Sequence, residues 1–174
     1  MTEVKKIMDT KLFHTDDNEI AEAGEILRNG GLVAFPTETV YGLGASAFDS
    51  DAAKKIYAAK GRPSDNPLIV HICDKGQIKD IAEEIPQSAK KVIDNFMPGP
   101  VTIILKKKSV VPNDVTAGLN TVAIRFPLHE TAQKLIKAAG VPIAAPSANL
   151  SGKPSPTKAK HVVKDMTGRI DAII

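Results

Sequence analysis

The sequence predicts a single α/β domain in which helices cover most of a β-sheet. Short apolar runs alternate along the chain with stretches whose apolar residues recur at helical spacing, which is typical of α/β folds. The run at 32–35 is continuously apolar, as expected for a strand buried on both faces. No linker-like segment divides the 174 residues. We therefore assign residues 1–174 to one domain.

The composition favours a soluble protein of a reducing cytoplasm. The chain is 43% hydrophobic and 25% charged, which suits one globular domain. No apolar run approaches the roughly 20 residues of a membrane helix, and the segment 1–6 is not followed by the apolar stretch of a signal peptide. The single cysteine, Cys73, cannot form an internal disulfide and is expected to be a small buried hydrophobe.

The charge favours a small anionic ligand over an extended nucleic-acid surface. The formal net charge is +3, which permits a local basic cavity but does not require a nucleic-acid partner. Aromatic residues make up 4% of the chain, with no Trp. Few rings are therefore available to stack on the bases of single-stranded RNA.

In the first half of the chain, residues 1–17 are predicted as a lead-in with a short strand at 11–13. A helix follows at 18–28, where Ile20, Ala23 and Leu27 lie on one face. The strand 32–35 precedes a polar, Gly-containing loop at 36–44. A second helix runs from about 50 to 60 and ends at Gly61, and Pro63 prevents its continuation. The apolar run at 68–72 is the next strand.

In the second half, Val122 and Ile124 alternate with Ala123 and Arg125, which predicts a half-exposed strand with Arg125 on its open face. The other elements follow from apolar periodicity and from Pro and Gly breaks. We expect helices at 75–84, 87–96, 130–139 and 158–166, strands at 101–105, 121–126, 141–145 and 171–174, and loops at 109–120 and 146–157.

Two glycine patterns resemble nucleotide-binding motifs but fail on context. Gly42-x-Gly44-x-x-Ala47 lacks the direct passage from strand to helix that a dinucleotide fingerprint needs. Gly152-Lys153 is followed by Pro where a phosphate loop needs Ser or Thr. The four histidines have no ligand spacing, so no structural zinc site is predicted.

A cationic loop follows the second helix. Lys60 and Arg62 suit phosphate oxygens, and Asn66 adds an amide in the same loop. Cations at a helix C-terminus also simply offset the helix dipole, and both interpretations remain open at this level.

A second polar loop follows the strand at 141–145. It supplies the Ser147 hydroxyl and the Asn149 amide, with a further hydroxyl at Ser155, although Ser and Pro also make ordinary turns. One cationic loop and one hydroxyl and amide loop at strand ends would suit a nucleotide triphosphate and its metal.

A third group of polar residues lies at or just beyond probable strands. Thr39, His71 and Arg125 form this group. Arg125 matches a carboxylate, yet taken alone it fits a surface ion pair better. His71 alone fits a hydrogen-bonded core histidine.

Several ordered segments carry a family resemblance. They are PTETVYGLG, KGRPSDNPLIVHI, FMPGPVTIILK, TVAIRFP and APSANLSGKPSPT. Together they resemble the threonylcarbamoyl-AMP synthase domain of the YrdC/Sua5 family over about residues 15–174. The resemblance implies a twisted mixed sheet with a basic concave face. The family usually continues with a Gly-rich turn and a Glu-Ser-Thr stretch, and the sequence, ending at Ile174, lacks that segment.

The resemblance also implies an activity. The family joins L-threonine, bicarbonate and ATP into threonylcarbamoyl-AMP and releases pyrophosphate, for N6-threonylcarbamoylation of adenosine 37 in tRNAs that read ANN codons. The implied catalytic residues are Lys60 and Arg62. The implied ATP contacts are Lys60, Arg62, Asn66, Thr121, Ser147, Asn149 and Ser155, and the implied threonine contacts are Thr39, His71, Arg125 and Ala145.

Mg²⁺ is expected with the ATP phosphates, and a tRNA threonylcarbamoyl transferase complex is expected to accept the product. Of these implied site residues, only His71 has an ordinary pKa suited to a general base. Two alternatives remain. One is a paralogue that binds tRNA or double-stranded RNA through Lys106-Lys107-Lys108 and a basic cavity. The other is a related domain that uses carbamoyl phosphate, which the absence of acylphosphatase and zinc-finger segments disfavours.

Overall fold

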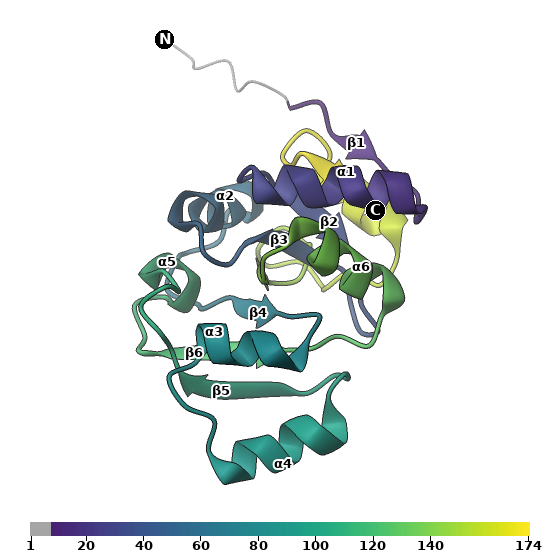
Figure 1. Ribbon diagram of the computed structural model, residues 1–174. Coiled ribbons are helices and arrows are strands. Elements are labelled where there is room, and N and C mark those ends of the chain that lie inside the picture. The colour runs from purple at the N-terminus through teal and green to yellow at the C-terminus, as the bar shows by residue number, and fades with distance from the viewer. Residues whose placement is uncertain (1–7) are drawn as a thin grey trace.

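An eight-stranded sheet forms the centre of the computed structural model, which describes residues 8–174 (Figure 1). The predicted α/β class is confirmed. The sheet has the order β1-β8-β2-β3-β7-β4-β6-β5. Its strands are β1 (Lys11–Leu12), β2 (Val33–Phe35), β3 (Gly42–Ser46), β4 (Ile69–His71), β5 (Thr102–Lys106), β6 (Thr121–Arg125), β7 (Ile143–Ala145) and β8 (Ala172–Ile173). The start of the predicted lead-in, and with it the segment that does not resemble a signal peptide, lies outside the described residues.

The sheet is mixed because strands distant in the sequence are neighbours in space. β8 pairs in parallel with both β1 and β2, and β4 pairs in parallel with β6. The pairs β2–β3, β3–β7, β4–β7 and β5–β6 are antiparallel. β2 and β7 therefore end at the same edge of the sheet, where the loops that follow them lie together, whereas β4 ends at the opposite edge.

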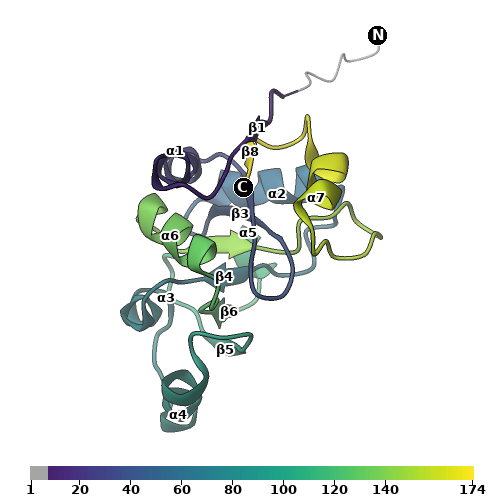
Figure 2. The same ribbon diagram turned by 90° about the vertical axis from the view of Figure 1, so that its right-hand side faces the viewer.

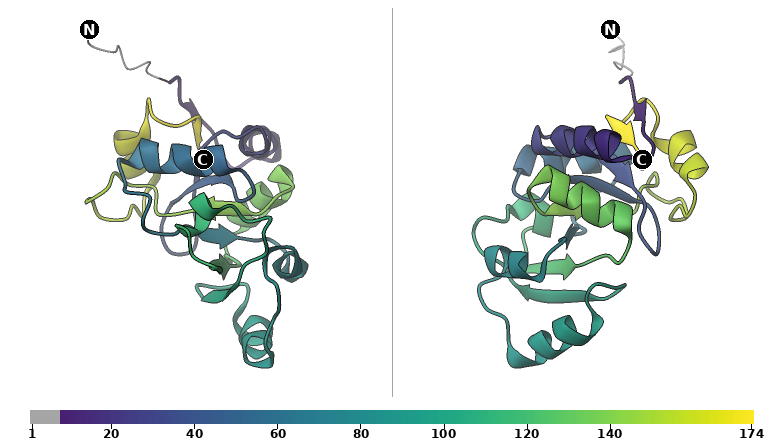
Figure 3. Two further views of the ribbon diagram at one scale, coloured as in Figure 1. Left: turned by 90° about the vertical axis from the view of Figure 1, so that its left-hand side faces the viewer. Right: turned by 45° about the vertical axis from the view of Figure 1, so that its right-hand side comes forward.

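Two helices cover one face of the sheet. α1 (Asp17–Arg28) and α6 (Glu130–Ala139) lie side by side, as Figures 1 and 3 show. Leu27 of α1 and Leu135 of α6 are fully buried in one cluster with Val33 and Ile143 of the sheet. Burying such side chains stabilises the fold by roughly 1.5–3 kcal/mol each.

The remaining helices belong to a second, larger core cluster or cap its edges. They are α2 (Ser50–Lys60), the 3₁₀ turn η1 (Lys75–Gln77), α3 (Ile78–Ile81), α4 (Gln87–Phe96), α5 (Asn113–Thr116) and α7 (Ala159–Met166). α7 lies on the opposite side of the molecule from α1 and α6 (Figure 2). Ile56, Ile81 and Met166 join Val70 and Ile124 of the sheet in this cluster.

One face of β5 and β6 stays open to solvent. Thr102 and Ile104 on β5 are exposed, Ile104 to 69%, and Arg125 on β6 is partly exposed, whereas Ile103 and Ile124 point the other way into the core. The predicted alternation of 121–126, with Arg125 on the open face, is confirmed. The loop at 36–41 meets this face where Thr39 contacts Arg125. The basic character of the face stays a prediction.

Three predicted elements were wrong in part. The predicted loop at 36–44 includes the start of β3. The glycines there suggested a loop, but Gly44 is required by packing, since a Cβ would lie 2.7 Å from Ile143 Cγ2 and 2.9 Å from Phe35 Cε1. Glycine in a strand marks such a close approach. The predicted helix 75–84 is only η1 and α3, since Ala82 turns extended and pairs with Lys107. The predicted loop at 109–120 contains α5.

The remaining elements agree with prediction to within one or two residues at their ends. Gly61 ends α2 in the left-handed conformation (φ 61°), as predicted. Gly42 and Gly44 lie inside β3, which agrees with the rejection of a dinucleotide fingerprint. Cys73 is half-buried against the α1–α6 cluster, and burial raises the pKa of its thiol. Within the described part of the chain, no helix combines the length and apolarity needed to span a membrane.

Candidate functional site

Two loops that are far apart in the sequence lie side by side. The loop at 36–41 follows β2, and the loop at 146–158 follows β7. The Tyr41 N–H donates to the Pro156 carbonyl, and the Ala148 N–H donates to the Tyr41 carbonyl, both at 2.8 Å. An isolated antiparallel bridge also joins Gly42 to Ser147. The ladder between β3 and β7 therefore continues into the loops.

Lys60 links α2 to the second loop. It is the last residue of α2 and is only 3% exposed. Its Nζ donates to the Ser147 carbonyl, and to the Asn149 carbonyl at 2.6 Å. Its own carbonyl accepts the N–H of Ser151 at 2.9 Å. The four predicted positions Lys60, Arg62, Ser147 and Asn149 are thus gathered around the C-terminus of α2.

The interior position of Lys60 changes its electrostatics. Burial, and secondarily the positive charge of Arg62, lower the pKa of Lys60 to about 8. The ammonium is still largely protonated at neutral pH. Because it is held by carbonyl oxygens, the charge has a fixed place beneath the Ser147–Asn149 segment.

Arg62 lies in a more open position. It is partly exposed, and its Nη2 donates to the Asn66 carbonyl at 3.3 Å. A groove of about 650 Å³ beside it is lined by Tyr57, Gly61 and Asp114, among others. Arg62 keeps most of its five N–H donors for a ligand.

Arg125 forms a second polar centre with the first loop. Its Nη2 donates to Thr39 Oγ1 at 3.0 Å and lies 2.8 Å from Glu38 Oε1. Burial raises the pKa of Glu38, but the Arg125 guanidinium and the backbone N–H of Leu128 more than offset this, so the pKa lies below its ordinary value. Glu38 and Arg125 are therefore an ionised, partly buried pair.

His71 lies next to Arg125 in the sheet and is buried. The two residues are register partners in β4 and β6. The His71 ring is 5% exposed, packs edge-on against Phe35, and donates from Nδ1 to the Ile69 carbonyl at 2.9 Å. Burial is the main cause that lowers the pKa of His71 to about 4. In the fold His71 is therefore a weaker base than its ordinary pKa suggests, and its role as a general base stays a prediction.

The other predicted residues flank these two centres. Ala145 pairs with Ile69 at the end of β7, and Thr121 pairs with Lys106 at the start of β6. Ser155 is exposed in the second loop, one residue before the Pro156 contact. Across residues 8–174, no side-chain hydrogen bond joins Thr121 or Ser155 to another candidate. Thr121 and Ser155 are therefore not joined to either polar centre by a side-chain hydrogen bond.

Comparison with known proteins decides the family. The model of the Sua5/YciO/YrdC family, described as "Telomere recombination", matches residues 25–174. The chain belongs to the Sua5/YciO/YrdC family.

Similar members of the family are named for one activity. The threonylcarbamoyl-AMP synthase of Bacillus subtilis is 59% identical over 166 residues, covering 95% of this chain and 48% of that protein. The Pyrococcus abyssi protein of the same name is 56% identical over 156 residues, covering 90% of this chain and 46% of that protein. The crystal structure of P. abyssi Sua5 complexed with L-threonine superimposes with a TM-score of 0.90 at 53% identity, covering 97% of this chain and 49% of that one. The chain thus spans about half the length of these relatives.

Glu38 is the residue of this Sua5/YciO/YrdC site that sequence reasoning missed. It lies in the segment PTETVYGLG beside Thr39, yet the sequence-based prediction includes only the threonine. The signal was present: Glu38 is the only acid between residues 36 and 44, and the Arg125 predicted on an open strand face needed an anionic partner. What the sequence lacked was the distance between them.

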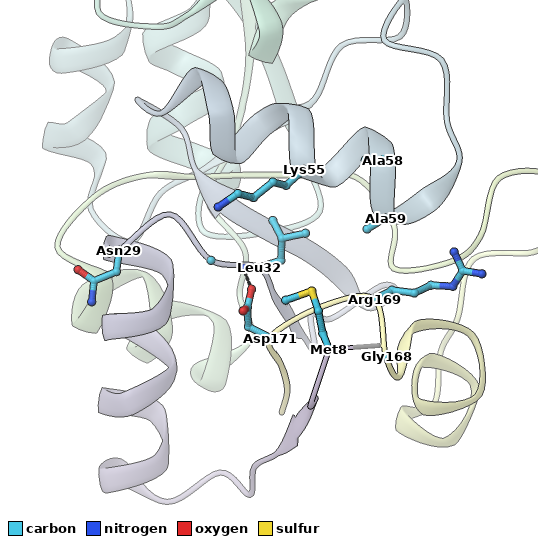
Figure 4. A pocket seen from close by; sticks show the side chains of 10 residues that line it. Met8, Asn29, Leu32, Lys55, Ala58, Ala59, Gly168, Arg169 and Asp171 are labelled. Carbon is cyan, nitrogen blue, oxygen red and sulfur yellow. Dashed lines mark hydrogen bonds between the residues drawn. The ribbon is translucent and has the colours of Figure 1, made fainter. Parts of the chain in front are cut away.

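A partly open pocket lies apart from the family site. This cavity of about 490 Å³ is lined by Leu32, Lys55, Ala59, Asp171 and Met8, among others (Figure 4). Lys55 donates to the Gly30 carbonyl at 2.7 Å and Asp171 accepts the Leu32 N–H at 2.7 Å. None of the predicted site residues lines it. The site is an open sheet face and two loops, not this cavity.

Proposed function

We propose that the domain catalyses formation of L-threonylcarbamoyl-AMP from L-threonine, bicarbonate and ATP, with release of pyrophosphate. The observation that carries the proposal is the Lys60 link. It joins the end of α2 to the Ser147–Asn149 segment, and backbone hydrogen bonds of Tyr41 join that second loop to the loop that carries Thr39. The names of the similar proteins and the threonine-bound relative support the same activity.

The amino-acid half of the site is assigned to the open sheet face. Arg125 would take the threonine carboxylate, because a guanidinium matches a carboxylate in bidentate geometry. Thr39 already contacts Arg125, and Ala145 would contribute its backbone. His71, neutral and fixed by Ile69, would shape the wall and present the lone pair of Nε2 as a hydrogen-bond acceptor.

The nucleotide half is assigned to the α2 terminus and the second loop. Arg62 would neutralise phosphate charge directly, since it is the more open cation. Lys60 would act from beneath the Ser147–Asn149 segment. The polar groups of Asn66, Thr121 and Ser155 would complete the contacts with ATP.

The chemistry asks for positioning more than for covalent work by the protein. The threonine amine attacks the carbon of bicarbonate and water leaves, which gives an N-carboxylate. An oxygen of that carboxylate then attacks the α-phosphorus of ATP, and the bond to pyrophosphate breaks in line. Holding the reactants and neutralising the developing charge lower the barrier. No step requires a protein nucleophile.

Mg²⁺ would enter with ATP. Among residues 8–174, no group of three or more His, Cys, Asp or Glu side chains is arranged to hold a metal ion. The site instead supplies cations and neutral donors, which suits phosphates that carry their own Mg²⁺.

The product would pass to a tRNA threonylcarbamoyl transferase complex in the cytoplasm, with at most weak tRNA binding by this domain. The lysine run does not favour an RNA-binding role. Lys107 Nζ donates to Val111 and Asn113, and Lys108 Nζ donates to the Lys79 carbonyl. Two of the three cations are therefore engaged within the chain.

The decisive experiment measures pyrophosphate release by the purified domain. We expect release that requires L-threonine, bicarbonate and ATP together, with an AMP-containing product. Serine in place of threonine serves as the substrate control. Turnover that persists without threonine or without bicarbonate would refute the proposal, as would strongly salt-dependent RNA binding in a domain that binds neither ATP nor threonine.

A further inference from the structure

We propose that Glu38 is a positioning residue that fixes the Arg125 guanidinium for the carboxylate of the amino-acid substrate. The inference rests on the function proposed above and extends it to a residue with no assigned role. Glu38 comes from the loop after β2, and Arg125 from the end of β6. The Glu38–Arg125 pair therefore joins the loop at 36–41 to the open sheet face.

The pair is built into the scaffold. Glu38 Oε1 lies 2.8 Å from Arg125 Nη2, and the side chains are only 19% and 12% exposed. A buried carboxylate is costly unless it is compensated. Here the compensation comes mainly from the charge of the Arg125 guanidinium. Glu38 is thus held by Arg125, and it holds Arg125 in turn.

The arrangement leaves Arg125 donors available for a ligand. Nη2 is engaged by Glu38 and Thr39, and Nε is buried without a hydrogen-bond partner in the described part of the chain. A guanidinium has five N–H groups in a rigid fork, so Nη1 remains. Fixing one end of the fork fixes the direction in which the other end points.

Glu38 itself is not placed to touch the substrate. Both of its carboxylate oxygens are buried from solvent. A ligand on the open face reaches Arg125 first, and Glu38 only through it. This distinguishes a supporting role from a contact with the substrate ammonium group.

The test is calorimetric titration of the domain with L-threonine and, separately, with ATP and Mg²⁺. In Glu38→Gln the side chain keeps its shape and loses its charge. We expect threonine to bind about tenfold more weakly or worse, the size of effect seen when the partner behind a ligand-binding side chain is removed. The ATP dissociation constant should change by less than about twofold, because Arg62 and Lys60 are untouched.

Two further variants make the experiment specific. Glu22→Gln removes an acid from an exposed ion pair with Lys11 and should leave both affinities unchanged. Glu38→Asp keeps the charge but withdraws it by one methylene, and should lie between wild type and Glu38→Gln in threonine affinity. Thermal unfolding of each unliganded variant reports general damage, and if Glu38→Gln does not fold, Glu38→Asp carries the test.

The outcomes separate the two proposals. A wild-type domain that does not bind threonine overturns the proposed function and this inference with it. A wild-type domain that binds threonine, with unchanged affinity in Glu38→Gln, overturns the inference alone. Tighter threonine binding in Glu38→Gln identifies Glu38 as a competitor and also overturns it. Equal losses of threonine and ATP affinity indicate general damage and contradict a positioning role.

Discussion

At the scale of single residues, Lys60 shows how one side chain can serve structure and site together. Its ammonium group meets the Ser147 and Asn149 carbonyls, and its own carbonyl accepts the Ser151 N–H. These contacts connect a helix end to a loop nearly ninety residues later in the chain. Two loop carbonyls therefore depend on one buried donor.

Lys60→Met should reduce both stability and activity. Methionine has a side chain of similar length but cannot donate to the two carbonyls, so the free energy of unfolding should fall by about 1–3 kcal/mol. Pyrophosphate release should fall on the order of 10²-fold or more, because charge at the site is lost as well. Urea denaturation and the turnover assay measure the two effects.

Arg62→Ala provides the matched comparison. Arg62 is partly exposed, with one hydrogen bond to Asn66, so activity should fall on the order of 10²-fold while stability changes by less than about 0.5 kcal/mol. Equal stability losses in the two variants would contradict the buried link. Near-normal rates in both would remove these residues from the site.

Much of the candidate site was predictable as chemistry, but not as geometry. Residue types at the ends of elements make Lys60, Arg62 and Arg125 candidates, and the family resemblance gives them roles. The sequence could not indicate that Lys60 is buried or that His71 is neutral, because burial depends on which elements pack together. Glu38 was not predicted because its role depends on a contact with Arg125, which lies 87 residues later in the chain.

At the scale of elements, β3 depends on two glycines, because a side chain at either position would crowd its neighbours. The strand carries Gly42 and Gly44 where they face Phe35 and Ile143. Glycine is unfavourable in strands, so the local sequence reads as a loop. The apolar strands, and the amphipathic helices other than the one predicted at 75–84, lacked this conflict and were predicted to within two residues. Element prediction failed where packing, not propensity, selects the residue.

Gly44→Ala should destabilise the domain measurably. The added methyl would meet the side chains of Ile143 and Phe35 in a closely packed core, which costs about 1–3 kcal/mol of unfolding free energy. Gly61→Ala is the comparison, because no atom lies within 4 Å of its added Cβ and only the left-handed backbone is strained, at about 1 kcal/mol. Urea denaturation of both variants checks this, and a neutral Gly44→Ala would show that β3 has room to spare.

At the scale of the whole molecule, the strand order was beyond the reach of the sequence. β1 near the N-terminus pairs with β8 near the end of the described chain, Lys11 opposite Ala172. Nothing in either short strand specifies its partner, because register follows from the buried faces of the assembled sheet. The same assembly leaves β5 and β6 open on one face, where Arg125 meets the loop at 36–41.

Protonation of His71 should couple to unfolding of the whole domain. Its pKa is about 4 in the folded state against an ordinary 6.5, through burial first and then the nearby Arg125, against which Glu38 acts weakly. The unfolded state therefore takes up the proton first as the pH falls. The stability is complete above pH 6.5 and is lost progressively down to about pH 4, by on the order of 3 kcal/mol in all.

Urea denaturation at about pH 7, 6 and 5 tests this coupling. Wild type should lose stability through this window, and His71→Gln should lose less, since it has no imidazole to protonate. His161→Gln, at an exposed histidine, should follow wild type. Parallel losses in wild type and His71→Gln would mean that His71 is protonated in the fold.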